Sequence, residues 1–246
     1  MCRIAAYAGP AIPLENIIIC PRHSLLEQSQ HATEAKLAVN GDGFGIAWYG
    51  EGGDPGLYRD VLPAWADENL TSLCRMVRSR LFLSHVRAST VGGTSRQNCH
   101  PFKHGRWTFM HNGQVPHFPQ IRRALEQALP DELYAARQGT TDSEMVFLTL
   151  LAHGLDTDPE AAMTRTLAAL GAGPAPVKLT CVFSNGHDVF AFRHASHGKA
   201  PTLYVSGPLD NGGRAFASEP LDGGAWDVVP ENQIVTLGKP AVSQAA

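Results

Sequence analysis

The strongest constraint on this chain lies at its beginning, where Met1-Cys2 precedes the apolar run at residues 3–8. Methionine aminopeptidases accept a small residue such as Cys after the initiator Met, so removal of Met1 would leave a thiol and a free α-amine on one residue. The thiol titrates near ~8.5 and the amine near ~7.7–8.0, so the neutral amine can take the thiol proton directly or through one water. The alternative is that Cys2 is a small apolar residue of a buried first strand, and Met-Cys alone favours this alternative.

The composition limits the class of protein. Of the 246 residues, 43% are hydrophobic and 17% charged, and 20 basic against 23 acidic residues give a net charge of −3. This balance predicts no nucleic-acid partner. No apolar stretch approaches the roughly 20 residues of a membrane span, and Pro10, Pro13 and Glu15 interrupt any signal-peptide core. Because no repeat or linker occurs, we expect one domain over residues 1–246.

The cysteines indicate a reducing compartment. They are odd in number and irregularly spaced, which argues against a disulfide framework and favours a cytoplasmic location. No C-x-x-C or H-E-x-x-H motif occurs, so we expect neither a metal nor another cofactor. The five cysteines are Cys2, Cys20, Cys74, Cys99 and Cys181.

Hydrophobic periodicity predicts the helices. Asp67 is a good N-cap for a helix whose apolar face reaches Val77. A second helix places Phe118, Ile121, Leu125 and Leu129 on one face. A third helix starts within residues 140–144 and is apolar nearly all round, so we expect it to lie buried between layers. A fourth covers about 159–170, whereas residues 24–39 show no clean period.

Runs rich in β-branched and aromatic residues predict the strands. Asn112-Gly113 should end one of them, and residues 89–106 should form a long loop. Asn185-Gly186 predicts a hairpin, because both positions suit a positive φ. Strands are expected at residues 3–8, 14–19 (a short strand or an extended segment), 44–49, 81–87, 107–111, 179–184, 187–193, 202–206, 214–217 and 232–237.

The order of these elements predicts the fold class. Strands cluster at both ends of the chain and helices lie between them. This order favours a layered α+β fold with mainly antiparallel sheets.

Four short stretches carry groups suited to amide chemistry. Cys2 offers a nucleophile, and Arg87, at the end of an apolar strand, offers a planar fork that suits a carboxylate. Asn112 and Gly113 offer a side-chain amide and a backbone N–H, the two donors of an oxyanion hole. Asp142, near a helix start, can hold a cationic amine. Singly, each is more often a surface charge, a turn or a helix cap.

Taken jointly, these stretches resemble the class II glutamine amidotransferase domain, which is of the N-terminal-nucleophile (Ntn) hydrolase type. The likeness in order and spacing covers roughly the first 150 residues. The strand pattern and Ser218-Glu219-Pro220 resemble the short, free-standing bacterial members, which include the γ-glutamyl hydrolase of ergothioneine synthesis. The motifs are Met1-Cys2, SHVRAST at 84–90, NCHPF at 98–102, HNG at 111–113 and TDSE at 141–144.

The resemblance implies a fold and a reaction. The fold is a four-layer αββα sandwich in which two mainly antiparallel sheets lie between helix layers, with the nucleophile on a central strand. Cys2 attacks the side-chain carbonyl of a γ-glutamyl amide, and water then cleaves the thioester. Asn112 and Gly113 stabilise the oxyanion.

The resemblance also implies how the substrate is held. Arg87 binds the α-carboxylate with Thr90 beside it, and Asp142 binds the α-ammonium. This pair selects a glutamyl group and leaves the amide side open. Two features depart from the larger biosynthetic members: the segment NGDGFG at 40–45 replaces their Arg-Gly entry, and Ala88 replaces their Trp.

Several functions remain open. The first is a γ-glutamyl amide hydrolase acting on glutamine or a γ-glutamyl conjugate. The second is a glutaminase subunit that feeds ammonia to a separate synthetase partner, which predicts an exposed apolar docking patch near the active site. The third is a non-catalytic module, against which intact Cys2, Asn112 and Asp142 speak. A hydrolase of the bile-salt or penicillin type would not need Arg87 together with Asp142.

Overall fold

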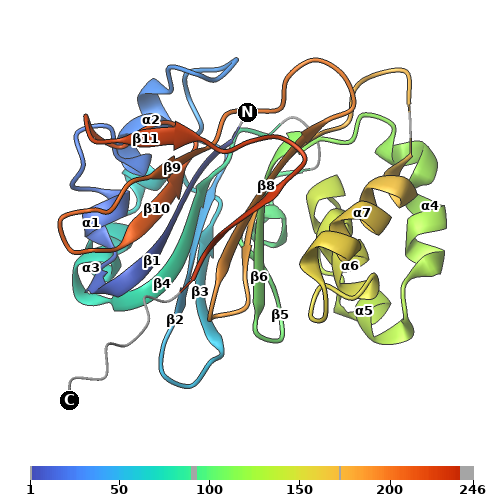
Figure 1. Cartoon of the computed structure of the whole chain (residues 1–246), viewed down its shortest axis with the longest axis horizontal. Helices are drawn as coiled ribbons and strands as arrows, with labels where there is room; N and C mark the ends of the chain where they lie inside the picture. The colour runs from blue at the N-terminus through green and yellow to red at the C-terminus, as the bar shows by residue number, and fades with distance from the viewer. Residues whose placement is uncertain (1, 90–92, 172, 239–246) are drawn as a thin grey trace.

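Two β-sheets lie face to face and helices cover both outer faces (Figure 1). The computed structural model describes residues 2–89, 93–171 and 173–238. Three apolar cores separate the four layers: helices against the first sheet, sheet against sheet, and the second sheet against the remaining helices. The expected α+β sandwich of the αββα type is confirmed.

The first sheet has β1 at its centre. Alternate residues of β1 enter different cores: Ile4 and Ala6 face the second sheet, and Ala5 and Tyr7 face the helices. A strand buried on both faces favours apolar residues at successive positions, which explains the unbroken apolar run at residues 4–8. Within the described residues the order is β11-β9-β10-β1-β4-β2-β3, all antiparallel. The bounds are β1 Arg3–Pro13, β2 Phe44–Tyr49, β3 Pro55–Asp60, β4 Arg78–Val86, β9 Tyr204–Ser206, β10 Arg214–Ala217 and β11 Trp226–Val228.

The second sheet is built around β6 and β7. Met110 of β6 faces the first sheet, and Phe109 faces the helices, where its ring stacks on that of Phe147 at 5.3 Å. Among the described residues the order is β12-β8-β7-β6-β5, again antiparallel. The bounds are β5 Phe102–His104, β6 Trp107–Gln114, β7 Lys178–Ser184, β8 Val189–Ala195 and β12 Ile234–Leu237.

The helices form the two outer layers (Figure 1). As expected, Asp67 caps α3, accepting hydrogen bonds from the backbone N–H groups of Asn69 and Leu70. The third expected helix, α6, is buried along nearly all its length. No helix of the described segments is long and apolar enough to cross a bilayer. The helices over the first sheet are α1 Glu15–Ile18, α2 Leu25–His31 and α3 Glu68–Met76, and those over the second are α4 Phe118–Ala128, α5 Asp131–Ala136, α6 Asp142–Ala152 and α7 Pro159–Leu170.

Two segments near the N-terminus differ from the expectation. Residues 14–19 were expected to form a short strand or an extended segment, but residues 15–18 form α1. The helical turn buries Ile17 and Ile18 against the first sheet. Burial outweighs the strand preference of the isoleucines. The stretch without a clean period contains α2, which Ser24 caps by accepting a hydrogen bond from the Glu27 N–H.

Turn signals were only partly correct. Asn112-Gly113 does not end β6, which continues to Gln114 because β7 pairs with it throughout. The expected hairpin forms, but only Gly186 has a positive φ. The Asn185 side-chain oxygen instead accepts hydrogen bonds from the backbone N–H groups of His187 and Asp188. The expected loop at 89–106 contains the short strand β5. Three further elements, β3, β11 and α5, were not predicted from the sequence.

Candidate active site

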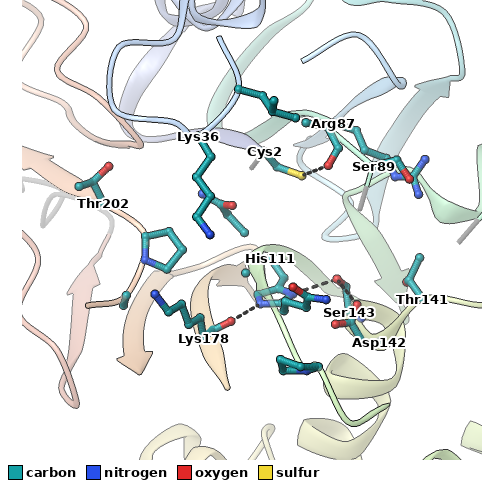
Figure 2. Close-up of a pocket in the computed structure, with 18 of the residues that line it drawn as sticks. Cys2, Lys36, Arg87, Ser89, His111, Thr141, Asp142, Ser143, Lys178 and Thr202 are labelled. Atoms are coloured by element: carbon teal, nitrogen blue, oxygen red, sulfur yellow. Dashed lines mark hydrogen bonds between the residues drawn. The ribbon is translucent and has the colours of Figure 1, made fainter. Parts of the chain in front are cut away.

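The ends of several elements meet in one cavity of about 650 Å³. The start of β1, the end of β4 and the start of α6 each contribute one predicted residue, and the final part of β6 contributes two. Figure 2 shows Cys2, Arg87 and Asp142 around this cavity. The cavity therefore brings together Cys2, Arg87, Asn112, Gly113 and Asp142. Thr90 lies outside the described residues.

Cys2 lies directly before β1, beside the end of β4. Arg3 pairs with Val86 across the two strands, so the register brings Cys2 next to the chain that leaves β4. Its half-buried thiol lies 3.7 Å from the carbonyl oxygen of Ala88 (Figure 2). Burial raises the pKa of the Cys2 thiol, and the hydrogen bond and the nearby Arg87 guanidinium oppose that rise.

A glycine-containing loop holds Arg87. The backbone N–H of Arg87 donates to Gly43 O at 2.8 Å, and that of Asp42 donates to Arg87 O at 2.9 Å. Gly43 has φ +111°, and a Cβ there would lie 2.6 Å from the Cys99 sulfur. The segment at 40–45 thus makes a close backbone contact with Arg87, whose side chain is buried.

Asn112 and Gly113 lie in the final part of β6. The Asn112 side chain is buried, and neither its Nδ2 nor its Oδ1 has a hydrogen-bond partner among the described residues. Gly113 has φ +155°, and a Cβ there would lie 1.9 Å from the Lys178 carbonyl oxygen. Because buried amides are normally paired, the Asn112 side chain is a candidate hydrogen-bond donor for a ligand.

Asp142 is the first residue of α6, and its carboxylate is fixed before any ligand arrives. One oxygen accepts from the Val115 N–H and the other from the Ser143 N–H, both at 2.8 Å. Asp142 is not the cap of this helix, because Thr141 accepts the capping hydrogen bond from Glu144. The carboxylate is therefore available to a cation in the cavity.

Three buried histidines, which the sequence analysis did not single out, lie around the site. Burial lowers the pKa of His85 to about 3, that of His100 well below its usual value, and that of His111 as well. The rings of His85 and His100 stack at 4.2 Å. Neutral His111 can donate from Nε2 to Lys178 O and accept at Nδ1 from the Ser143 hydroxyl (Figure 2). The histidines therefore bring no positive charge to the cavity.

A buried ion pair fixes the residue after Cys2. Arg3 is fully buried, and its Nη1 lies 2.9 Å from Oε1 of Glu219, which is 1% exposed. Burial alone would raise the pKa of Glu219, but hydrogen bonds from Thr33, Glu34 and His23 outweigh it and lower the pKa to about 2. In the sequence, Ser218-Glu219-Pro220 is only a family likeness, because no local pattern shows that Glu219 pairs with Arg3.

Within the described residues, no group of three or more His, Cys, Asp or Glu side chains is arranged to hold a metal ion. The cavity is lined instead by groups that include the Arg87 guanidinium, the Asn112 amide and the Asp142 carboxylate.

The family model of class II glutamine amidotransferases matches residues 22–205, well over half of the chain. The chain belongs to this family. The match begins at residue 22 and does not include Cys2. The placement of the Cys2 thiol in the cavity therefore comes from the structure alone.

Full-length relatives support the assignment. "Probable glutamine amidotransferase DUG3" of Saccharomyces cerevisiae is 32% identical over 98% of this chain and 83% of its own. "Gamma-glutamyl-hercynylcysteine sulfoxide hydrolase" of Mycobacterium tuberculosis is 29% identical over 100% of this chain and 97% of its own. A solved glutamine aminotransferase class-II domain protein from Silicibacter pomeroyi is 38% identical, covers 96% of this chain and 95% of its own, and has a TM-score of 0.76.

The Glu219 carboxylate predicts an acid-sensitive contribution to stability. Its pKa is lower in the folded protein, so the contribution is complete above about pH 4.5 and is lost as the pH falls toward 2. We expect this contribution to be about 3 kcal/mol. The measurement is the free energy of unfolding by urea from pH 5 to pH 2, compared between the wild type and Glu219→Gln.

Glu219→Gln should also cost about 3–5 kcal/mol at neutral pH, because Arg3 would remain buried without an anion. Glu15→Gln is the matched control. Glu15 pairs with the exposed Arg75 at 3.7 Å, and its loss should cost less than about 1 kcal/mol. Equal losses in the two variants, or the same acid profile in wild type and Glu219→Gln, would contradict the role of the buried pair.

Proposed function

We propose that this chain hydrolyses the γ-glutamyl amide bond of glutamine or of a γ-glutamyl conjugate, with Cys2 as its N-terminal nucleophile after removal of Met1. Membership of the family and the full-length relatives support amidotransferase or γ-glutamyl hydrolase activity. The observation that carries the proposal is the placement of Arg87 and Asp142 in the same cavity as Cys2. A fixed cation and a fixed anion suit the two charges of a glutamyl α-carbon.

The reaction begins at the thiol. The neutral α-amine of Cys2 takes the thiol proton, and the sulfur attacks the γ-carbonyl carbon. As the C–S bond forms, the carbonyl oxygen becomes an oxyanion, which Asn112 Nδ2 and the Gly113 N–H stabilise. The C–N bond then breaks, and the leaving amine takes a proton from the α-ammonium. Water attacks the thioester by the same route and releases glutamate and free Cys2.

Substrate selection follows from the charges. Arg87 binds the α-carboxylate, and Thr90 is a further proposed contact of the substrate. Ser89 also lines the cavity. Asp142 binds the α-ammonium, since two backbone N–H groups already hold its carboxylate in place. A simple amide lacks both charges and would lose both contacts.

A second candidate is a glutaminase subunit that delivers ammonia to a synthetase. Leu37 and Val39 favour it, because they are 56% and 55% exposed and Leu37 borders the cavity. Such residues could seat a partner. Turnover of isolated protein separates the candidates, since a subunit would be nearly inert alone.

The same proposal includes the setting of the protein. All five cysteines are free, in keeping with a reducing cytoplasm. We also infer that residues 1–246 act as one domain with a small-molecule substrate and without a cofactor.

Cys2→Ala should abolish glutamate release from glutamine and from γ-glutamyl conjugates. The matched control is Cys20→Ala, which removes an exposed free thiol and should keep full activity. Intact mass must show Met1 absent in all proteins compared. Turnover by Cys2→Ala above the uncatalysed rate would exclude Cys2 as the nucleophile.

Asn112→Ala should lower kcat by about 10²–10³ because one oxyanion donor is lost. The free energy of unfolding should change by less than about 1 kcal/mol, because the amide has no partner among the described residues. In contrast, Asn98→Ala removes three hydrogen bonds with Gly93 and Thr140 and should destabilise by about 1–3 kcal/mol. If Asn112→Ala kept the wild-type kcat, the oxyanion role would be wrong.

Asp142→Asn should raise KM for glutamine about 10–100-fold, since a charged hydrogen bond becomes neutral. The desamino analogue of glutamine lacks the ammonium, so its KM should rise far less. The measurement is KM for both compounds with both proteins. An equal rise for the two would remove the ammonium from the proposed contacts.

A further inference from the structure

The cavity continues beyond the groups that recognise a glutamyl residue. In the view of Figure 2, Arg87, Ser89 and Asp142 lie on one side of Cys2, and Lys36 and Lys178 lie on the other. A third lysine, Lys199, also lines this cavity. The proposed mechanism does not use these three lysines.

The lysines come from three separate parts of the chain. Lys178 is the half-buried first residue of β7, where it pairs with Gln114 and Ala195. Lys36 belongs to the loop between α2 and β2, and Lys199 to the loop between β8 and β9. Their convergence on one cavity is a property of the fold.

Both loops are tied to the body of the protein. In the first loop, the Ala32 N–H donates to Ala38 O at 3.0 Å, and Thr33 and Glu34 donate to the buried carboxylate of Glu219. The second loop is held by Glu231, which accepts from the Ala200 N–H at 3.0 Å. Each lysine therefore extends from an anchored backbone.

The charge balance at this end of the cavity is positive. Glu34 is the acidic residue on this part of the lining, and its carboxylate accepts hydrogen bonds from the Tyr204 hydroxyl at 2.9 and 3.0 Å. The ammonium groups of Lys36, Lys178 and Lys199 have no hydrogen-bond or ion-pair partner within the parts of the chain that the structure describes. The lining thus carries three lysines together with Glu34, whose carboxylate is already hydrogen-bonded.

Building on the proposed function, we propose that Lys36, Lys178 and Lys199 form a subsite for a carboxylate on the leaving group. The preferred substrate is then a γ-glutamyl amino acid or peptide, whose leaving amine carries a carboxylate. Ammonia, the leaving group of glutamine, has no anion for these lysines to bind. The cations at this end also disfavour leaving groups that carry extra positive charge.

The test compares two substrates of nearly equal size, γ-glutamylglycine and γ-glutamylglycinamide, which differ by one negative charge. The measured quantity is the ratio of their kcat/KM values, because general damage to a variant cancels in it. We expect wild type to prefer the glycine conjugate about tenfold or more. Each of Lys36→Gln, Lys178→Gln and Lys199→Gln should lower the ratio about threefold, and the triple variant about 10–30-fold.

Two controls accompany this measurement. Arg123→Gln removes an exposed positive charge on α4 outside the cavity and should leave the ratio unchanged. Raising the salt concentration should lower the wild-type ratio, because ions screen the lysines from the carboxylate. A wild-type ratio near one, or equal ratios in wild type and the triple variant, would overturn the carboxylate subsite.

Equilibrium binding separates this inference from the proposed function. The Cys2→Ala protein should bind γ-glutamylglycine more tightly than γ-glutamylglycinamide, and the triple lysine substitution in that background should remove the difference. If Cys2→Ala with its lysines intact bound the two compounds equally, and wild type also turned them over equally, the subsite would be refuted. A preference in binding without hydrolysis by wild type supports the subsite and refutes the proposed function.

Discussion

The site depends on the buried ion pair between Arg3 and Glu219. A guanidinium with no exposure is stable only if an anion meets it, so this pair fixes the first residue of β1 next to Cys2. The same carboxylate binds the backbone of Thr33 and Glu34 and thereby holds the loop that carries Lys36. One side chain from the C-terminal part of the chain thus sets the positions of the proposed nucleophile and of one cavity wall.

Polar groups that folding alone would not favour lie in and around the cavity. The Asn112 amide, His85 Nδ1 and both ring nitrogens of His100 are buried without partners among the described residues. Each such group costs free energy unless a ligand or water meets it. The three apolar cores between the layers offset this cost, since most residues of β1, β6 and β7 are buried. Such pre-organised donors are what a reaction with a developing oxyanion requires.

Local patterns predicted most helices and a layered α+β fold, and the family resemblance supplied the four layers and the proposed glutamyl end of the cavity. The spacing of apolar residues predicted α4, α6 and α7, and the N-cap at Asp67 predicted the start of α3. Short motifs pointed to Cys2 and to Asn112-Gly113 as candidate site residues. Each motif consists of neighbouring residues, so it can be recognised in the sequence alone. The contact of Arg3 with Glu219 spans 216 residues, and no local signal reports it. Likewise, α1 formed where β-branched residues favoured a strand, since packing against the first sheet decided its conformation.

The two ends of the cavity have different origins in the structure. Cys2, Arg87, Asn112 and Asp142 lie at the ends of regular elements, where strand pairing and the start of a helix fix them. Lys36 and Lys199 lie on loops, which can change without disturbing the sheets. The proposed glutamyl end is therefore the part a family can keep in common, and the lysine end is the part in which members can differ. A carboxylate-bearing leaving group would then be a property of these loops in this chain.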